Sequence, residues 1–125
     1  MNNAYDSDLA RKLNLKSGTG LRVVSRPDDA RLDGLQVGPS SGNDALLVFV
    51  RSRAEAEAQA PAVAGVAASG EIAWMAYPKG GQLGTDLNRD SLAALMRAHG
   101  VRAVRQVSLD DVWSLLRFRP DPDAS

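Results

Sequence analysis

The fold is decided by the stretch Asp44-Ala45-Leu46-Leu47-Val48-Phe49-Val50-Arg51-Ser52-Arg53. Apolar residues follow Asp44 without a break, and a run without alternation is typical of a strand covered on both faces, as in a parallel sheet. Ser52 and Glu55 then stand at the spacing of a helix capping box. A buried strand followed directly by a helix predicts a crossover to a second parallel strand.

The helix that follows is rich in alanine, and we predict it over residues 53–68, ending at Ser69-Gly70. Pro61 is expected to kink or split it, because proline lacks the N–H that the helix needs. Small apolar residues recur on one face, which we expect to pack on the sheet, with packing on a second copy as the alternative. These residues are Ala54, Ala58, Ala62 and Val66.

The remaining elements extend this pattern in both directions along the chain. In chain order they are a helix over residues 6–13, a strand over 21–24, a loop over 28–43, a strand over 72–77, a glycine-rich loop over 78–86, a helix capped by Asn88, and two strands over 101–109 and 112–118. Strands that alternate with helices predict an α/β fold. We expect a small Rossmann-like three-layer sandwich, with helices on both faces of a mostly parallel sheet and a C-terminal antiparallel β-hairpin. Residues 1–120 are expected to form one domain, and 121–125 a flexible tail.

Composition excludes several classes of protein. The 15 basic and 15 acidic residues cancel, so no global field attracts nucleic acid or an anionic membrane. Cysteine is absent, which excludes disulfides, thiolate zinc sites and cysteine nucleophiles. The first residues lack the pattern of a secretory signal, and the longest apolar run is far too short to span a membrane. We therefore expect a cytoplasmic location.

Four segments together resemble a known bacterial family. They are Val50-Arg51-Ser52, Tyr77-Pro78-Lys79, Thr85-Asp86-Leu87 and Trp113-Ser114. The chain resembles domain-of-unknown-function family three-zero-five-two over residues 9–119. This family carries no known activity, so the resemblance implies a fold and no function.

The element order is also distantly similar to the C-terminal half of class I methyltransferases. Those enzymes place glycines directly after their first strand, whereas Gly18 and Gly20 precede the strand over 21–24. Neither S-adenosylmethionine nor NAD is therefore expected, and no other cofactor is predicted.

The candidate site follows from strand geometry. If the strands ending at Val50 and Tyr77 are parallel neighbours, the loops after them share one crevice, where ligands bind in such sheets. Backbone N–H groups, hydroxyls and cationic side chains there suit a phosphate or carboxylate. The expected ligand residues are Arg51, Ser52, Lys79, Gly80, Gly81, Thr85 and Asp86, with Trp113 and Ser114 as a wall. In the alternative interpretation, the hydroxyls and Asp86 cap helices, the glycines make a turn and the cations are solvated.

No catalytic set and no metal site is predicted. His99 is the one histidine, at the end of its helix, where a structural role is expected. Asp28-Asp29 and Asp110-Asp111 fit turns. Arginines concentrate near the C-terminus, where a charged sheet edge explains them. They are Arg97, Arg102, Arg105, Arg117 and Arg119.

Three functional hypotheses remain open. The first is a non-catalytic or regulatory module that acts through protein contacts or a small anionic ligand. The second is an enzyme, or a nucleotide- or phosphate-binding protein, that uses the crevice. The third is nucleic-acid binding by the arginine-bearing hairpin, which the charge balance disfavours. The sequence fits either a monomer or a homodimer and identifies no specific partner.

Overall fold

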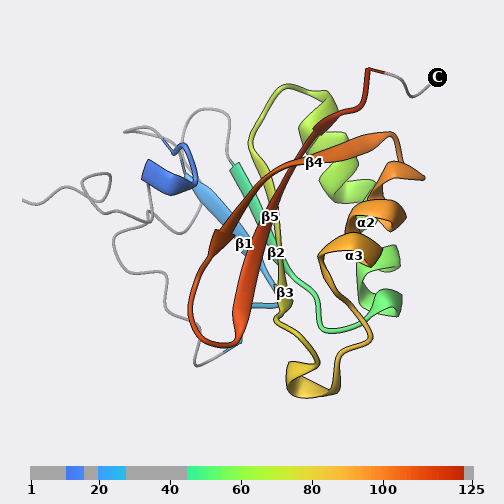
Figure 1. Cartoon of the computed structure of the whole chain (residues 1–125). Helices are drawn as coiled ribbons and strands as arrows, with labels where there is room; N and C mark the ends of the chain where they lie inside the picture. Colours follow the sequence, from blue (N-terminus) through green and yellow to red (C-terminus); the bar gives the residue numbers. More distant parts are fainter. Residues whose placement is uncertain (1–10, 16–19, 28–44, 123–125) are drawn as a thin grey trace, which may run out of the picture.

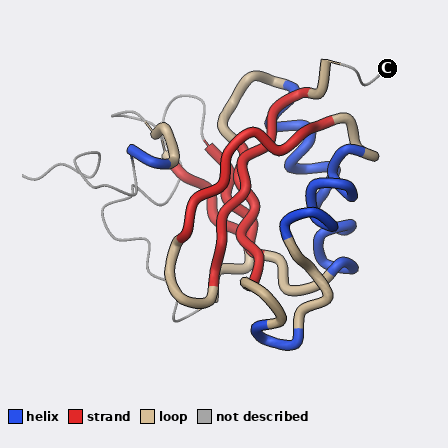
Figure 2. Tube along the Cα trace, viewed as in Figure 1, coloured by secondary structure: helices blue, strands red, loops and turns tan. Residues whose placement is uncertain are grey.

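A computed structural model describes residues 11–15, 20–27 and 45–122 of the chain. Two α-helices and a five-stranded sheet make up its regular structure, as Figures 1 and 2 show. The elements are β1 (Leu21–Val24), β2 (Ala45–Phe49), α2 (Arg53–Ala68), β3 (Ala73–Pro78), the 3₁₀ turn η2 (Gln82–Gly84), α3 (Arg89–Arg97), β4 (Val101–Ser108) and β5 (Trp113–Pro120). The predictions over residues 6–10 and 28–43 lie outside the described residues.

The sheet is mixed, with strand order β1-β2-β3-β5-β4. β1, β2 and β3 are parallel, whereas β5 is antiparallel to both of its neighbours, β3 and β4. The predicted α/β class and hairpin are confirmed, but the prediction of a mostly parallel sheet is wrong. The path of the chain after α3 explains the mixed sheet, because it leaves a gap of one strand between β3 and β4. β4 runs in the direction of β3 one strand away, and β5 fills the gap between them antiparallel to both.

The two hairpin strands differ in composition, and this explains which one lies inside the sheet. β5 begins with four consecutive buried residues, Trp113 to Leu116. β4 buries only Val101 and Val107 and is otherwise mostly exposed. Burial of apolar surface favours the more apolar strand in the interior, and an edge strand tolerates charged side chains. β4 therefore forms an edge of the sheet.

α2 and α3 lie on the same face of the sheet (Figure 1). They cover a core that includes Val48, Met75 and Leu116. The opposite face carries a second core around Trp74, which residues 11–15 cover. The Trp74 Nε1–H donates to the Leu13 carbonyl at 3.2 Å and holds this segment in place. Arg11 and Lys12 of this segment are helical, so the described residues include helical structure on both faces of the sheet.

α2 has the predicted bounds, but it uses a different face. Ser52 caps it by accepting a hydrogen bond from the Glu55 N–H at 3.1 Å. Of the two outcomes predicted for Pro61, a kink or a split, the split does not occur, because the helix runs unbroken through this exposed residue. The residues that pack on the sheet are Ala56, Ala60, Val63 and Ala67. The predicted face is wrong because both sides carry alanines and one valine, so their composition does not distinguish them; Val66 of the predicted face packs only at the margin of the core.

The position of β2 beside β3 is the arrangement on which the predicted crevice depends. The two strands are parallel neighbours, with Val48 opposite Met75 and Phe49 opposite Ala76. Their carboxyl ends therefore meet at one edge of the sheet. Neither helix in the described part of the chain is long and apolar enough to cross a membrane.

Candidate functional site

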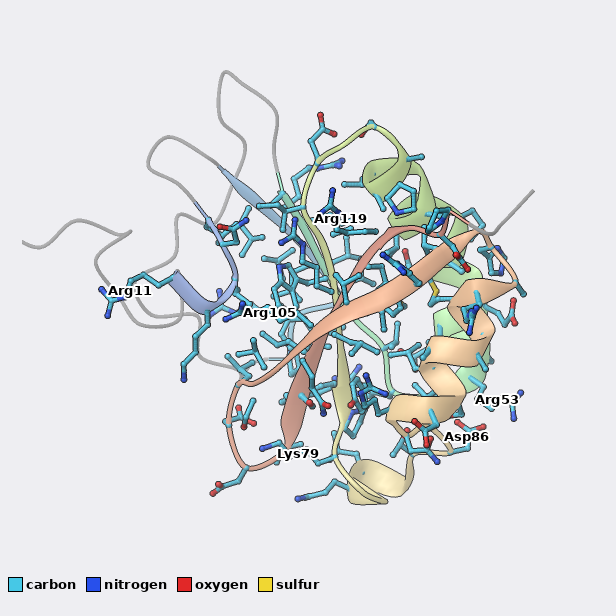
Figure 3. All side chains as sticks on the ribbon, turned by 45° about the horizontal axis from the view of Figure 1, so that its top comes forward. Arg11, Arg53, Lys79, Asp86, Arg105 and Arg119 are labelled. Atoms are coloured by element: carbon cyan, nitrogen blue, oxygen red, sulfur yellow. The ribbon has the colours of Figure 1, made fainter. Side chains whose placement is uncertain are left out.

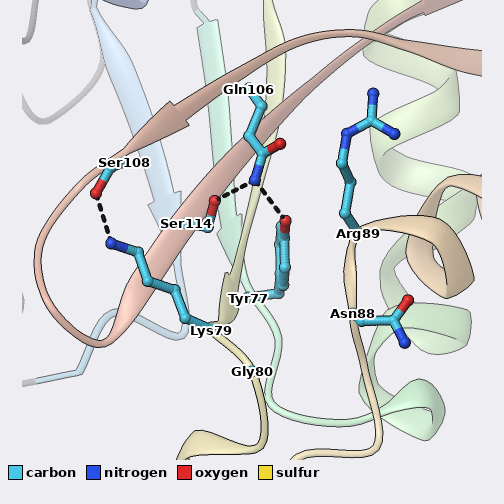
Figure 4. Close-up of a pocket in the computed structure, with 8 residues that line it drawn as sticks. All are labelled: Tyr77, Lys79, Gly80, Asn88, Arg89, Gln106, Ser108 and Ser114. Carbon is cyan, nitrogen blue, oxygen red and sulfur yellow. Dashed lines mark hydrogen bonds between the residues drawn. The ribbon is translucent and has the colours of Figure 1, made fainter.

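An open pocket of about 410 Å³ lies at the carboxyl end of β3. It is bounded by the β4–β5 hairpin and by the N-terminus of α3, as Figure 4 shows. The lining residues are Tyr77, Lys79, Gly80, Asn88, Arg89, Gln106, Ser108 and Ser114. They come from four elements and one loop, so only the folded chain brings them together.

The strand register explains why three polar side chains of the hairpin share the pocket. Tyr77 is opposite Ser114 in the β3–β5 ladder, and Ser114 is opposite Ser108 in the β4–β5 ladder. Directly paired residues point to the same face of a sheet. Gln106 is two residues before Ser108 and therefore shares that face. This is the helix face, which places all four side chains near the start of α3.

A hydrogen-bond network joins the floor of the pocket. The Gln106 Nε2 donates to the Tyr77 hydroxyl at 3.1 Å and to Ser114 Oγ at 3.1 Å. Both hydroxyls act as acceptors in these bonds, because an amide nitrogen only donates. Each hydroxyl therefore keeps its own proton for a further bond. Tyr77 and Ser114 are buried, so the network is held rigidly beneath the opening.

The charged side chains of the pocket are both cationic. Lys79 Nζ donates to Ser108 Oγ at 2.6 Å, which fixes the ammonium against the hairpin (Figure 4). Arg89 lies on the other side of the pocket, in the first turn of α3. None of the eight lining residues is acidic. Asp90, which does not line the pocket, is 3.5 Å from the Arg89 guanidinium through its Oδ1, at an exposed position. The lining itself offers donors and cations, which suit an anion.

The loop after β3 is tied to the hairpin at two points. The Lys79 N–H donates to the Val112 carbonyl at 2.7 Å, and Gln82 Nε2 donates to the Asp111 carbonyl at 2.9 Å. Between these contacts the backbone takes left-handed conformations, with φ of 77° at Gly81. Glycine adopts such a conformation at little cost. Gly81, which was expected among the ligand residues, does not line the pocket and instead forms the turn of the alternative interpretation.

Three residues expected in the crevice instead cap helices and turns. Ser52 caps α2, and Thr85 Oγ1 accepts a hydrogen bond from the Leu87 N–H at 3.0 Å. Asp86 Oδ1 accepts from the Arg53 N–H at 2.8 Å, which places a carboxylate at the N-terminus of α2 (Figure 3). A carboxylate there would repel an anion. None of the three lines the pocket, as the structural alternative expected.

Arg51 and Trp113 lie on the far side of the sheet from the pocket. The Arg51 guanidinium carbon is 5.8 Å from the centre of the Trp113 ring, a cation–π contact. Trp113 packs edge-to-face on Phe49, with ring centres 5.0 Å apart, and belongs to the second core. Of the residues that the sequence singled out, Lys79, Gly80 and Ser114 line the pocket.

Sequence analysis missed Tyr77, Asn88, Arg89, Gln106 and Ser108 as lining residues. Asn88 was identified only as a helix cap, which it is, since its Oδ1 accepts from the Ser91 N–H at 2.8 Å. The sequence does indicate that Gln106 and Ser108 lie on one face, because they are two residues apart in a predicted strand. This spacing identifies a site only once β5 is known to lie beside β3.

The pocket contains no histidine. His99 lies just beyond the end of α3, where its Nε2 is 3.3 Å from Glu57 Oε2 of α2. This contact joins the two helices, as its expected structural role requires. No group of three or more potential metal ligands occurs among residues 11–15, 20–27 and 45–122.

Comparisons with protein-family models, with curated proteins and with solved structures found no match. The functional argument therefore rests on the geometry of the chain itself.

Proposed function

We propose that this chain is a non-catalytic binding module for a small ligand that carries a phosphate or carboxylate group. The observation that supports the proposal most directly is the pocket beside Tyr77, where two cations and several hydroxyls converge without an acidic residue. Its volume of about 410 Å³ lies within the range of small-molecule sites.

The anionic group of the ligand would lie between Lys79 and Arg89. Lysine offers a point charge, and arginine offers a planar fork that can hold two oxygens of a phosphate or carboxylate. The hydroxyls of Tyr77 and Ser114 accept from Gln106, so each can donate its own proton to the same group. Lys79 is oriented by Ser108 before a ligand arrives, so part of the ordering cost of binding is already met.

Thermal unfolding in the presence of phosphorylated and carboxylated metabolites tests this proposal. A ligand at one hundred times its dissociation constant adds about 2.7 kcal/mol to the free energy of unfolding. We expect that Lys79→Ala and Arg89→Ala each remove the shift. Arg51→Ala is the matched control, because Arg51 also follows a strand but lies on the opposite face. Loss of the shift in Arg51→Ala alone would contradict the proposed pocket.

A second candidate function follows from the 2.6 Å contact between Lys79 and Ser108. A serine with a lysine base is a known arrangement for nucleophilic catalysis. No described residue orients the lysine as a third member, which makes this candidate weaker. Treatment with a fluorophosphonate followed by mass spectrometry tests it. Labelling of Ser108 would support an enzyme, and an unlabelled protein would exclude this mechanism.

We also propose that the fold is Rossmann-like, because β2, α2 and β3 form the parallel strand–helix–strand unit of such folds. Membership of the bacterial domain-of-unknown-function family stays a proposal based on the four sequence segments. A cytoplasmic location is proposed from the absence of cysteine.

A further inference from the structure

A second cationic site lies on the opposite face of the sheet, at the other end of the hairpin. Arg102 is directly opposite Arg119, and Arg105 is directly opposite Arg117. We call these four residues the arginine quartet. They line a pocket of about 530 Å³ together with Val104, Pro120 and Pro122.

A bulge in β4 assembles the arginine quartet. The register shifts between Ala103 and Arg105, so that Val104 has no partner in β5. Without the extra residue, Arg102 and Arg105 would point to opposite faces, since side chains alternate along a strand. With it, both share a face with their partners Arg119 and Arg117. Ala103 and its partner Phe118 face the helices, so the quartet faces away from them; Figure 3 labels Arg105 and Arg119 of the quartet.

The arginine quartet is unfavourable in the free protein. Like charges directly opposite each other destabilise a strand pair. Burial, together with the charges of Arg119 and Arg105, lowers the pKa of Arg117 below its ordinary value. The Arg117 Nε is buried and has no hydrogen-bond partner. Within the described residues, none of the four guanidinium groups forms an ion pair.

One acidic side chain lies nearby without neutralising the quartet. Glu71 lines a smaller pocket of about 140 Å³ with Arg117 and Arg119. Its Oε2 accepts a hydrogen bond from the Ser69 hydroxyl at 2.6 Å, and it forms no ion pair with either arginine. The positive charge of the quartet is therefore left for a partner from outside the described chain.

The surroundings of the arginine quartet favour a compact anion over an extended nucleic acid. Single-stranded nucleic acids stack their bases on exposed aromatic side chains. All aromatic side chains among the described residues are buried; they are Phe49, Trp74, Tyr77, Trp113 and Phe118. The net charge of the chain is zero, so no global positive field adds to the attraction of the quartet for an extended nucleic acid. Four guanidinium groups in a concave site match several adjacent phosphates in one small molecule.

We infer that the arginine quartet binds a ligand with two or more linked phosphate groups, such as a polyphosphate chain or the phosphates of a nucleotide. The guanidinium pairs follow one another along the hairpin at a two-residue step of about 7 Å. One pair can hold one phosphate, and the next pair can hold its neighbour. This site is separate from the pocket beside Tyr77 and does not depend on its proposed function.

Calorimetric titration of the full chain with tripolyphosphate, pyrophosphate and orthophosphate tests the inference. We expect tripolyphosphate to bind at least about tenfold more tightly than orthophosphate, because it engages more charge-assisted hydrogen bonds. Arg105→Gln and Arg119→Gln are the primary variants, since both side chains are exposed and their loss should leave the fold intact. Each should weaken tripolyphosphate binding by roughly tenfold or more.

Two controls separate this site from other cationic surfaces. Arg22→Gln removes an exposed strand arginine outside the quartet and should leave the affinity unchanged. Lys79→Gln combined with Arg89→Gln removes the cations of the pocket beside Tyr77, so tripolyphosphate that this variant still binds and that Arg119→Gln loses is held by the quartet. Loss of binding in that double variant would place the phosphates in the pocket beside Tyr77 and overturn the inference.

A nucleotide and a single-stranded oligonucleotide identify the source of the phosphates. Binding of ATP in the same range as tripolyphosphate, with the same loss in Arg119→Gln, would support a nucleotide. Binding of tripolyphosphate alone would support an inorganic polyphosphate. An oligonucleotide that binds more tightly than tripolyphosphate would overturn the inference in favour of nucleic acid. If tripolyphosphate does not bind, the inference is also overturned, because the quartet then holds no linked phosphates.

Discussion

The carboxylate of Asp86 stabilises the start of α2 across a gap of 33 residues in sequence. In the sequence, Asp86 fits either a ligand residue or a helix cap. The contact with the Arg53 N–H identifies it as a cap. Aspartate is a common local helix cap, but a cap supplied by a distant loop leaves no spacing pattern in the sequence.

We expect Asp86→Ala to lower the free energy of unfolding by about 1 kcal/mol, because the helix loses a hydrogen bond and a favourable charge at its N-terminus. Asp86→Asn keeps an accepting oxygen and should cost less. Urea denaturation of both variants checks this order. An Asn variant as unstable as the Ala variant would mean that the hydrogen bond contributes little.

Arg117 is the residue at which removal of charge should stabilise the protein. Its lowered pKa means that the folded state disfavours the charged form. The penalty applies at every pH below the folded-state pKa, and therefore throughout the neutral range. Arg117→Met keeps an unbranched apolar stem and removes the unpaired Nε. We expect a gain of up to about 1 kcal/mol at low salt.

Thermal unfolding at low and high salt measures this effect. The gain should shrink as salt rises, because salt screens the repulsion within the arginine quartet. Arg22→Met is the control, since it removes a strand arginine away from the quartet and should change little. A Met variant that is less stable at low salt would show that the stem and head of Arg117 pack favourably as they stand.

At the scale of elements, the sequence was most informative where the signal is local. The apolar run at Ala45–Phe49 determines β2, and the capping serine determines the start of α2, through residues of the element itself or next to it. Both elements were predicted correctly. The arrangement of β5 between β3 and β4 was not predicted, because it depends on a comparison of two strands and on the return path of α3.

Pro61 offers a test of α2 as an element. It lies in the middle of an intact helix at an exposed position, so it removes a backbone hydrogen bond without a compensating contact in the core. Pro61→Ala is expected to raise the free energy of unfolding by about 1–3 kcal/mol. Ala62→Gly, at the next exposed position, should lower it by about 1 kcal/mol. Denaturant unfolding gives both values, and a destabilised Pro61→Ala would contradict the reasoning.

At the scale of the whole molecule, the two cationic sites lie on opposite faces of one sheet. Lys79 belongs to the pocket on the helix face, and Arg117 belongs to the quartet on the other. The sequence identified Lys79 and the arginines by residue type but could not assign them to faces. The assignment depends on the order of the strands and on the bulge at Val104, neither of which has a local signature.

Because the two sites share no residue, their effects on stability should be independent. We expect the changes in unfolding free energy of Lys79→Ala and Arg117→Met to add within about 0.5 kcal/mol in the double variant. Chemical denaturation of the two single variants and the double variant checks this sum. A larger interaction energy would mean that the hairpin transmits strain between its two ends.

The position of β5 has a consequence for how the protein is made. It is the fifth strand in chain order, yet it separates β3 from β4. While the ribosome still holds residues 113–120, β3 has an open side and β4 has no strand partner. A nascent chain of that length can form β1, β2 and α2, but it cannot complete the sheet. The sheet is completed only after the eight residues of β5 leave the exit tunnel.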